Sequence, residues 1–323
     1  MTILVTGCGG FLGINLCRTL LRAGHAVIGL DNYSTGARKK LQELQSFANF
    51  TGIEADVTEP FPADLPPATH VYNLACPASP PHYQKDPVKT MRTSIWGAWH
   101  VLEYARRHQS VVLQASTSEV YGDPKIHPQS EDYVGHVNPI GIRACYDEGK
   151  RAAEAMFFDY HRQYGLAIKV IRIFNTYGPG MNADDGRVVS NFVIKALRQQ
   201  PIEIYGDGSQ TRSFCYIDDL IDGMIRMMSS DPSVTGPINL GNPDEFTMLQ
   251  LAQKIKSITA SDSPIVFKSL PSDDPQQRQP DITRAKKILG WSPVVGIDAG
   301  LQKTADYFAS LLDNDKTPRA ANG

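Results

Sequence analysis

The sequence lacks the features that mark several large classes of protein. No apolar run reaches membrane-spanning length, and no basic stretch followed by an apolar segment precedes the first strand. The 32 basic and 34 acidic residues give a formal net charge of −2, which offers no basic surplus for nucleic acid. We therefore expect a soluble, cytoplasmic protein whose partners are neither nucleic acids nor membranes.

Cysteine and clustered histidine are also scarce. The five cysteines are an odd number without paired spacing, which is typical of a reducing compartment. The eight histidines are scattered, and His82, His127 and His136 are not spaced as metal ligands, so we expect no metal. With 323 residues, 41% of them hydrophobic, the chain can bury the core of two lobes.

A glycine-rich turn follows the first apolar segment. Residues 2–6 are typical of a strand and residues 12–23 of a helix, and between them lies the run Gly7-Cys8-Gly9-Gly10-Phe11-Leu12-Gly13. Glycines at this spacing let the backbone approach a pyrophosphate, and the helix N-terminus behind them offers free N–H groups. The turn therefore predicts a dinucleotide site.

The next strand indicates which dinucleotide binds. Residues 26–30 are apolar and lead to Asp31 and Asn32. A carboxylate at this strand end accepts hydrogen bonds from ribose hydroxyls and repels a 2′-phosphate, which favours NAD over NADP. Lys39 and Lys40 lie close enough in the sequence to leave NADP open.

The alternation of strands and helices continues through the first half of the chain. A third strand leads to Asp56 and Val57, where Asp56 either binds the adenine amino group or caps a turn, and residues 70–74 form a fourth. This order predicts an α/β fold, a Rossmann-type doubly wound parallel sheet with a smaller C-terminal substrate-binding lobe. We expect an NAD-binding domain over 1–174, a substrate lobe over 175–312 and a disordered tail over 313–323.

Tyr146 and Lys150 lie four residues apart, downstream of Thr117 at the end of the fifth expected strand. Four residues are about one helical turn, so the phenol and the ammonium share a face. A neighbouring cation lowers the pKa of a phenol, which would suit Tyr146 to take a proton from a sugar hydroxyl. Thr117 would hold the same substrate oxygen. An ordinary exposed helix pair is the alternative reading of this spacing.

With these residues in place, the chain resembles the extended short-chain dehydrogenases/reductases that act on nucleotide sugars, and most narrowly the UDP-glucuronate decarboxylases. The resemblance covers residues 2 to about 301. Gly180 and Ser94 depart from the usual family residues, which are Arg and Asn. The stretches that carry the resemblance are Asn73–Pro80, Ser116–Pro124, Asn138–Arg151, Arg172–Pro179, Asp185–Phe192 and Gly206–Phe214.

The resemblance implies a redox-neutral decarboxylation of UDP-glucuronate to UDP-xylose and CO2. Oxidation of C4 places a ketone β to the C6 carboxylate, so the electrons left by CO2 have a sink, and the 4-keto sugar is then reduced. Glu119 would act as a base or orient water near C5, and Arg212 would lie near the diphosphate or carboxylate. The structural alternatives are a turn cap for Glu119 and surface cations for Arg212 and Arg278.

Ser118 distinguishes a decarboxylase from the related nucleotide-sugar enzymes. The 4,6-dehydratases resemble the chain but carry Asp at that position, as the acid that expels the C6 hydroxyl. A neutral Ser118 can instead hydrogen-bond a C6 carboxylate that Asp would repel. A 4-epimerase, which shares Tyr146 and Lys150 but has no need of Glu119 and Arg212, stays an alternative, as does a non-catalytic NAD-binding module.

The resemblance also implies the remaining site residues and the assembly. Relatives commonly dimerise through two helices at about 87–107 and 143–164, which form a four-helix bundle. The residues predicted for the cofactor are Gly7, Gly10, Phe11, Leu12, Gly13, Asp31, Asn32, Asp56, Val57, Leu74, Ala75, Tyr146 and Lys150. Those predicted for the UDP-sugar are Pro77, Ser79, Glu119, Asn175, Arg187, Val188, Asn191, Tyr205, Arg212 and Arg278.

Overall fold

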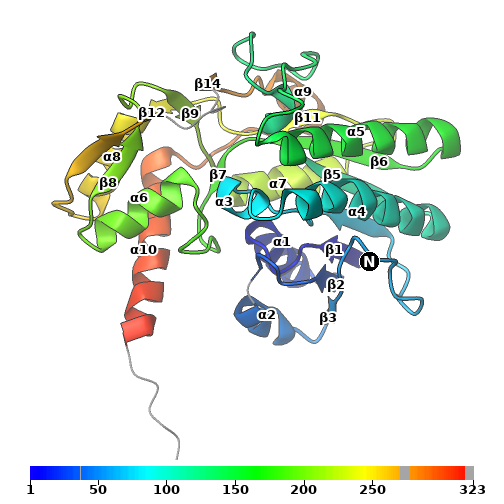
Figure 1. Cartoon of the computed structure of the whole chain (residues 1–323). Coiled ribbons are helices and arrows are strands. Elements are labelled where there is room, and N and C mark those ends of the chain that lie inside the picture. Colours follow the sequence, from blue (N-terminus) through cyan, green and yellow to red (C-terminus); the bar gives the residue numbers. More distant parts are fainter. Residues whose placement is uncertain (37, 270–276, 317–323) are drawn as a thin grey trace, which may run out of the picture.

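The computed structural model describes residues 1–36, 38–269 and 277–316. Its centre is a seven-stranded parallel sheet in the order β11-β6-β5-β4-β1-β2-β3 (Figure 1), which confirms the predicted fold class. The strands are β1 (Thr2–Thr6), β2 (Ala26–Asp31), β3 (Phe50–Glu54), β4 (His70–Asn73), β5 (Val111–Thr117), β6 (Ile168–Ile173) and β11 (Ile238–Leu240).

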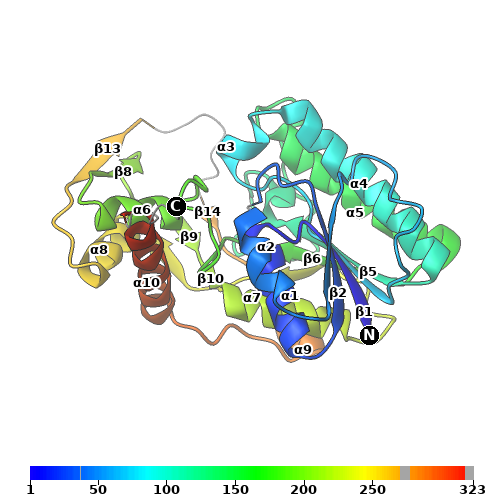
Figure 2. The ribbon, with the colours of Figure 1, turned by 90° about the horizontal axis from the view of Figure 1, so that it is seen from below.

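Helices cover both faces of this sheet, as Figure 2 shows. Successive strand residues point to opposite faces, and both faces must be apolar when both are covered. In β1, Ile3 and Val5 enter one core while Leu4 enters the other. One layer contains α1 (Phe11–Arg22), α2 (Arg38–Gln45), α7 (Ile217–Met228) and α9 (Thr283–Leu289), and the other α4 (Pro87–His108) and α5 (Ala144–Tyr164).

The strand order reverses between β1 and β4, which lie side by side although β2 and β3 come between them in the sequence. Two turns therefore meet at the carboxyl ends of these strands. Gly7 has a φ of +72°, and a Cβ built there would lie 2.9 Å from the backbone nitrogen of Ala75. Ligands of open α/β sheets bind at such a switch point.

The smaller lobe is built mainly from the second half of the chain (Figure 1). Its two short sheets pair β8 with β13 and order the others as β12-β9-β14. The elements are α6 (Val188–Leu197), α8 (Met248–Ile258), α10 (Ile297–Lys316), β8 (Ile202–Tyr205), β9 (Thr211–Ser213), β12 (Glu245–Thr247), β13 (Ile265–Lys268) and β14 (Gln277–Arg278). Short elements β7 (Thr176–Tyr177) and β10 (Cys215–Tyr216) pair with each other between the lobes.

The boundary expected at residue 174 is wrong as a linear division. β11 pairs with β6 in the large sheet, and α7 packs on the same layer as α1, so the chain returns to the first domain after leaving it. The hydrophobic runs of these later elements resemble those of the substrate lobe, and pairing across such a distance leaves no local signal. The expected tail also begins too early, because α10 continues to Lys316, and residues 317–323 lie outside the described part.

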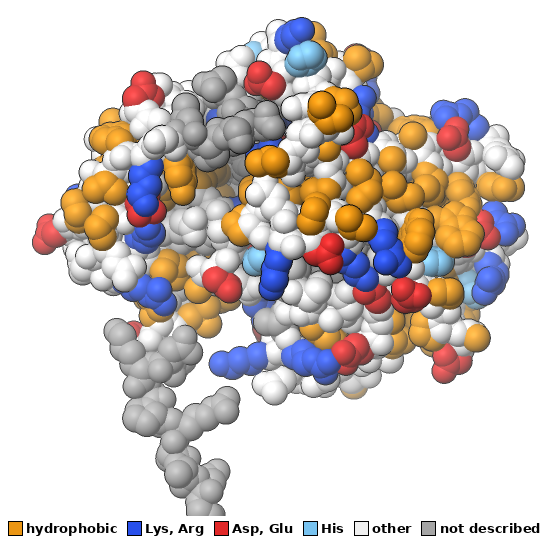
Figure 3. All heavy atoms as spheres, in the orientation of Figure 1, with side chains coloured by type: hydrophobic (Ala, Val, Ile, Leu, Met, Phe, Trp, Pro, Cys, Tyr) orange, Lys and Arg blue, Asp and Glu red, His pale blue; other side chains and the backbone are white. Residues whose placement is uncertain are grey.

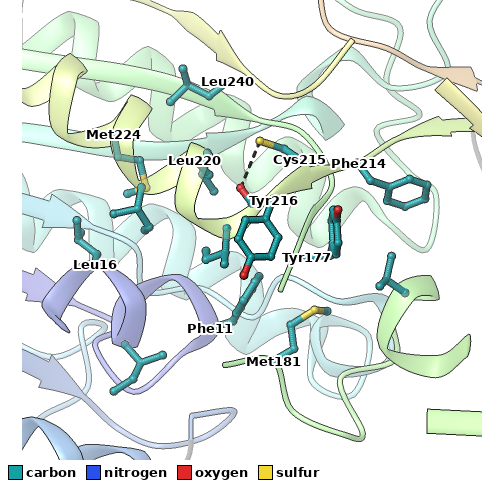
Figure 4. Packing of buried hydrophobic residues seen from close by; sticks show 14 of the residues in the cluster. Phe11, Leu16, Tyr177, Met181, Phe214, Cys215, Tyr216, Leu220, Met224 and Leu240 are labelled. Carbon is teal, nitrogen blue, oxygen red and sulfur yellow. Dashed lines mark hydrogen bonds between the residues drawn. The ribbon is translucent and has the colours of Figure 1, made fainter. Parts of the chain in front are cut away.

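One hydrophobic core joins the two lobes. Phe11 of α1 lies beside Tyr177, Met181 and Tyr216 from the connecting segments, as Figure 4 shows. The rings of Tyr177 and Tyr216 meet edge to face with centroids 5.7 Å apart. The position of the second lobe over the sheet is thus set by apolar packing.

Three further observations concern the described residues alone. None of their helices combines the length and the apolar character that crossing a membrane requires. No group of three or more His, Cys, Asp and Glu side chains among them is arranged to hold a metal ion. All five cysteines are free thiols.

Gly13 supplies a direct test of the turn after β1. A Cβ at this position would lie 2.1 Å from the Gly7 carbonyl oxygen and 2.7 Å from Cys8 Cα, and this backbone cannot move without disturbing β1. We expect Gly13→Ala to lower the free energy of unfolding by about 3 kcal/mol, as overpacking in a core does. Denaturant unfolding of the ligand-free protein measures it.

Gly296→Ala is the matched control, because a Cβ there meets no atom within 4 Å. Its free energy of unfolding should stay close to that of the parent. Equal stability of the two variants would contradict the proposed tight turn.

Candidate active site

A cavity of about 470 Å³ lies between the carboxyl edge of the large sheet and the smaller lobe. It brings together residues that are far apart in the sequence and come from both lobes. The predicted site residues that line it are Leu12, Leu74, Thr117, Ser118, Glu119, Tyr146, Lys150, Asn175, Arg187, Val188, Asn191, Tyr205, Arg212 and Arg278.

Two predicted substrate residues do not line this cavity. Ser79 is buried, and its Oγ lies 2.9 Å from His82 Nδ1 within the turn at α3 (Pro80–Tyr83). Pro77 is likewise absent from the wall, although its neighbours Cys76 and Ala78 belong to it. The sequence thus located the segment, and contacts of Pro77 and Ser79 with the substrate stay predictions.

The turn after β1 fits a dinucleotide. Asp31 accepts hydrogen bonds from the backbone nitrogens of Gly9 at 2.8 Å and Tyr33 at 2.7 Å, which fix its carboxylate at the end of β2. The N-terminus of α1 has no side-chain cap at Gly10, so its N–H groups face the turn without a protein acceptor from that residue. Gly7 packs directly on the backbone of Ala75, so this turn and the loop after β4 meet at the switch point only because residue 7 has no side chain.

The carboxylate of Asp56 already accepts several hydrogen bonds from the protein itself. It accepts from Lys89 Nζ at 2.6 Å, from Asn32 at 3.0 Å and from the backbone and hydroxyl of Thr58. Burial opposes ionisation, but these hydrogen bonds outweigh it and hold the pKa of Asp56 below its usual range. Asp56 thus caps the turn that follows β3, as one of the two readings expected, and its contact with adenine stays a prediction.

Lys40 does not face the ribose end of the turn after β2. Its Nζ donates to the Gly180 carbonyl oxygen at 2.6 Å and to Asn182 Oδ1 at 2.5 Å, in the connection to the smaller lobe. Burial lowers the pKa of Lys40 to about 8. Lys40, one of the two lysines that left NADP as a possible cofactor, therefore has a structural role between the lobes.

Thr117, Tyr146 and Lys150 meet at the sheet edge. Lys150 Nζ lies 5.9 Å from the centroid of the Tyr146 ring and donates to the Ala115 carbonyl oxygen at 2.9 Å. The pKa of Tyr146 is nevertheless raised in the ligand-free site, and whether Lys150 lowers it in the loaded enzyme stays a prediction. Burial raises that pKa, the Cys76 thiol adds to the shift, and the hydrogen bond with Thr117 only partly offsets them.

Glu119 is a partly buried carboxylate held by arginines from three segments. It pairs with Arg143 and lies 3.3 Å from Arg278 Nη2, while Arg278 Nη1 donates to the Ser118 carbonyl oxygen at 2.6 Å. Burial alone would raise the pKa of Glu119, but Arg278, Arg143 and Arg212 outweigh it and lower the pKa. Arg278 is 2% exposed, so the surface-cation reading of that residue is wrong.

Arg187 connects the turn after β1 to the smaller lobe. Its guanidinium carbon lies 5.2 Å from the centroid of the Phe11 ring, at the start of α1. It also donates to Asp185, which keeps the cation at the edge of the cavity. A diphosphate that bridges the two lobes would meet Arg187 between them.

Sequence reasoning missed several residues of the wall, and two of them bear on its chemistry. Arg143 precedes α5 and faces Glu119, and Tyr83 stacks on Tyr146 with ring centroids 5.0 Å apart and planes at 4°. Arg143 stands one helical turn before Asp147, so its position beside Tyr146 was a usable signal. Tyr83 left no such signal, because its contact with Tyr146 depends on the path of the loop after β4.

Comparisons with known proteins show the family to which the chain belongs. The NAD dependent epimerase/dehydratase family model matches residues 3–241. UDP-glucuronic acid decarboxylase 5 of Arabidopsis thaliana is 51% identical over 313 residues, covering 97% of this chain and 90% of that protein. UDP-glucuronic acid decarboxylase 1 of Danio rerio is 49% identical over 312 residues, covering 97% and 73%.

Solved structures give the same picture. UDP-glucuronic acid 4-epimerase from Bacillus cereus, in complex with UDP-glucuronic acid and NAD, has a TM-score of 0.86 and 30% identity, covering 96% of this chain and 100% of that one. UDP-glucose 4-epimerase from Thermotoga maritima has a TM-score of 0.87 and 29% identity, covering 97% and 100%. The chain belongs to the NAD-dependent epimerase/dehydratase family of extended short-chain dehydrogenases/reductases, within its UDP-glucuronic acid decarboxylases.

Proposed function

We propose that this protein is a carboxy-lyase that converts UDP-glucuronate to UDP-xylose and CO2 and uses NAD without net consumption. The observation that carries the proposal is the cavity wall around Glu119, where Arg143, Arg212 and Arg278 surround a carboxylate next to a neutral Ser118. This wall accommodates an anionic hexuronate, and relatives about half identical to the chain bear the decarboxylase name.

NAD, when bound, accepts the hydride from C4 of the sugar and later returns it, and its nicotinamide adds a positive charge to the site. Tyr146 takes the proton of the C4 hydroxyl, with Thr117 on the same oxygen and Lys150 below the ring. Because the phenol has a raised pKa in the ligand-free site, positive charge has to enter the site before Tyr146 can act as a base.

Once C4 is a ketone, the C5–C6 bond breaks and C6 leaves as CO2, while the bonding electrons form an enolate over C5, C4 and O4. C5 then needs a proton. Glu119 does not store that proton, since Arg143 and Arg278 keep it ionised. We assign to Glu119 the orientation of a water molecule that delivers the proton to C5. Of the two roles expected from the resemblance, the water-orienting one fits the lowered pKa of Glu119.

The binding residues that we propose come from the sequence prediction and from the cavity wall; of the cofactor set, Leu12, Leu74, Tyr146 and Lys150 line the cavity. The cofactor would be held by Gly7, Gly10, Phe11, Leu12, Gly13, Asp31, Asn32, Leu74, Ala75, Tyr146 and Lys150, with Asp56 and Val57 at its adenine end. The UDP-sugar would contact Ser118, Glu119, Arg143, Asn175, Arg187, Val188, Asn191, Tyr205, Arg212 and Arg278.

The assembly we propose is a homodimer through α4 and α5. Figure 3 shows hydrophobic side chains gathered in a band over these helices. Trp96 and Trp99 of α4 are each 47% exposed and Tyr164 of α5 is 50% exposed, which is more aromatic surface than a lone helix pair needs. The free cysteines support a reducing compartment such as the cytoplasm.

Replacement of Tyr146 by Phe tests the chemistry. The ring and its stack on Tyr83 are kept, but the proton acceptor is lost, so we expect turnover to fall by about a thousandfold, within the range of acid–base contributions. Proton NMR of UDP-glucuronate incubated with protein and NAD follows UDP-xylose. The parent should form it without net NADH. Full activity of Tyr146→Phe, or a parent product that retains C6, would contradict the mechanism.

Replacement of Ser118 by Asp tests the carboxylate site. Ser118 is 2% exposed, and a second negative charge beside Glu119 would repel the hexuronate. We expect the Kd for UDP-glucuronate to rise by about tenfold or more, while UDP-glucose, which lacks the carboxylate, is affected less. Calorimetric titration measures both ligands, with Ser118→Ala as the uncharged control. Unchanged affinity of Ser118→Asp for UDP-glucuronate would overturn this assignment.

Replacement of Trp99 by Glu tests the dimer. A charge in the apolar band should convert the dimer to a monomer, because a buried charge without a partner is costly. Sedimentation velocity measures the mass. Val294→Glu is the control, since Val294 is 84% exposed and lies in the connection between α9 and α10. A dimer that survives Trp99→Glu, or a parent that is monomeric, would contradict the interface.

A further inference from the structure

Asp147 is a buried carboxylate directly behind the cavity wall. It follows Tyr146 in the first turn of α5, is 6% exposed, and its Oδ1 has no hydrogen-bond partner among the described residues. It does not line the cavity itself. A buried carboxylate oxygen without a donor costs stability, so its presence calls for a function.

Its contact with the site runs through Arg143. Asp147 Oδ2 lies 3.7 Å from Arg143 Nε, while Nη2 of the same guanidinium pairs with Glu119. One arginine thus faces two carboxylates, one inside the cavity and one outside it. The charge on Asp147 decides how much of the Arg143 cation is left for Glu119 and for an anionic ligand.

We propose that Asp147 is a positioning residue that acts through Arg143, and that its ionisation sets the affinity of the site for the carboxylate of a hexuronate. The proposal rests on the function proposed above and adds a control element to the same site. When Asp147 is protonated and neutral, the full positive charge of Arg143 acts on Glu119 and on a ligand in the cavity. With Asp147 ionised, part of that charge is cancelled and the ligand carboxylate meets a further negative charge behind the wall.

The groups around Asp147 place its titration near neutral pH. Burial raises the pKa of Asp147 to about 7, Glu119 adds to the shift, Arg143 and Arg278 oppose it, and Glu148 contributes a small increase. Tyr83 also faces it, from α3. Asp147 is therefore mostly protonated at pH 6 and mostly ionised at pH 8.5, whereas the carboxylate and diphosphate of UDP-glucuronate are ionised at both.

The sign for stability follows from the same raised pKa. Between the unfolded pKa of an Asp, near ~4, and the folded one, the native state binds more protons than the unfolded state. Stability therefore falls as pH rises through this window, and the cost is fully present above the folded pKa. Asp147→Asn removes that cost, so the variant should be at least as stable as the parent at pH 8.5.

The experiment compares Asp147→Asn with the parent at pH 6, 7 and 8.5, using calorimetric titration with UDP-glucuronate and with UDP-glucose in the presence of NAD. We expect the Kd of the parent for UDP-glucuronate to rise roughly fivefold across this range, by Coulomb repulsion over several ångströms. In Asp147→Asn the Kd should stay flat. UDP-glucose should bind both proteins with little pH dependence.

Asp159→Asn is the matched control, because Asp159 lies on the same helix, is exposed, and pairs with Arg162. It should keep the pH dependence of the parent. The proposal is overturned if Asp147→Asn keeps the parent's pH dependence, weakens binding equally at every pH, or is less stable than the parent at pH 8.5. The titration measures binding and does not depend on turnover. If no UDP-xylose forms, the proposed reaction is contradicted, but the role proposed for Asp147 can still be tested.

Discussion

The contact between Arg278 and the Ser118–Glu119 turn is the interaction on which the site depends. Arg278 belongs to the smaller lobe, and the turn follows β5 at the edge of the large sheet. A fully buried guanidinium is stable only when its donors are satisfied, and here they are used across the lobe boundary. The same contact closes the wall of the cavity, so the architecture of the chain and the charge of its site are set together.

The first half of the fold could be predicted from the sequence, because the sequence signals there are local. The glycine turn, Asp31 at a strand end and the Tyr146–Lys150 spacing each depend on neighbours within a few residues or one helical turn. The return of β11 to the large sheet could not be read in this way, since its pairing with β6 is decided by tertiary packing. Tyr83 was missed for the same reason, because its stack on Tyr146 crosses between segments, whereas Arg143 had a local signal in its spacing to Asp147.

Tyr146 shows where a local rule fails quantitatively. The spacing to Lys150 is right, yet burial of the phenol has a larger effect on its pKa than the ammonium 5.9 Å from the ring. Burial makes the charged phenolate less stable and so raises the pKa. The ammonium of Lys150 lowers that pKa less when it also donates a hydrogen bond to a backbone carbonyl. Proximity in the sequence predicts the proposed catalytic pair but not the protonation state of its phenol.

Charge balance links these observations. In the ligand-free site, Arg143, Arg212 and Arg278 face the carboxylate of Glu119, and Asp147 takes part of the charge of Arg143 from behind. A nucleotide-sugar brings a diphosphate and a carboxylate into this surplus of positive charge, where low polarity strengthens each interaction. Reactions that leave C6 uncharged have no use for so many cations beside a neutral Ser118. The arrangement of charge therefore fits a substrate with a charged C6, which distinguishes the site from relatives that act on an uncharged C6 but not from an epimerase that binds UDP-glucuronic acid.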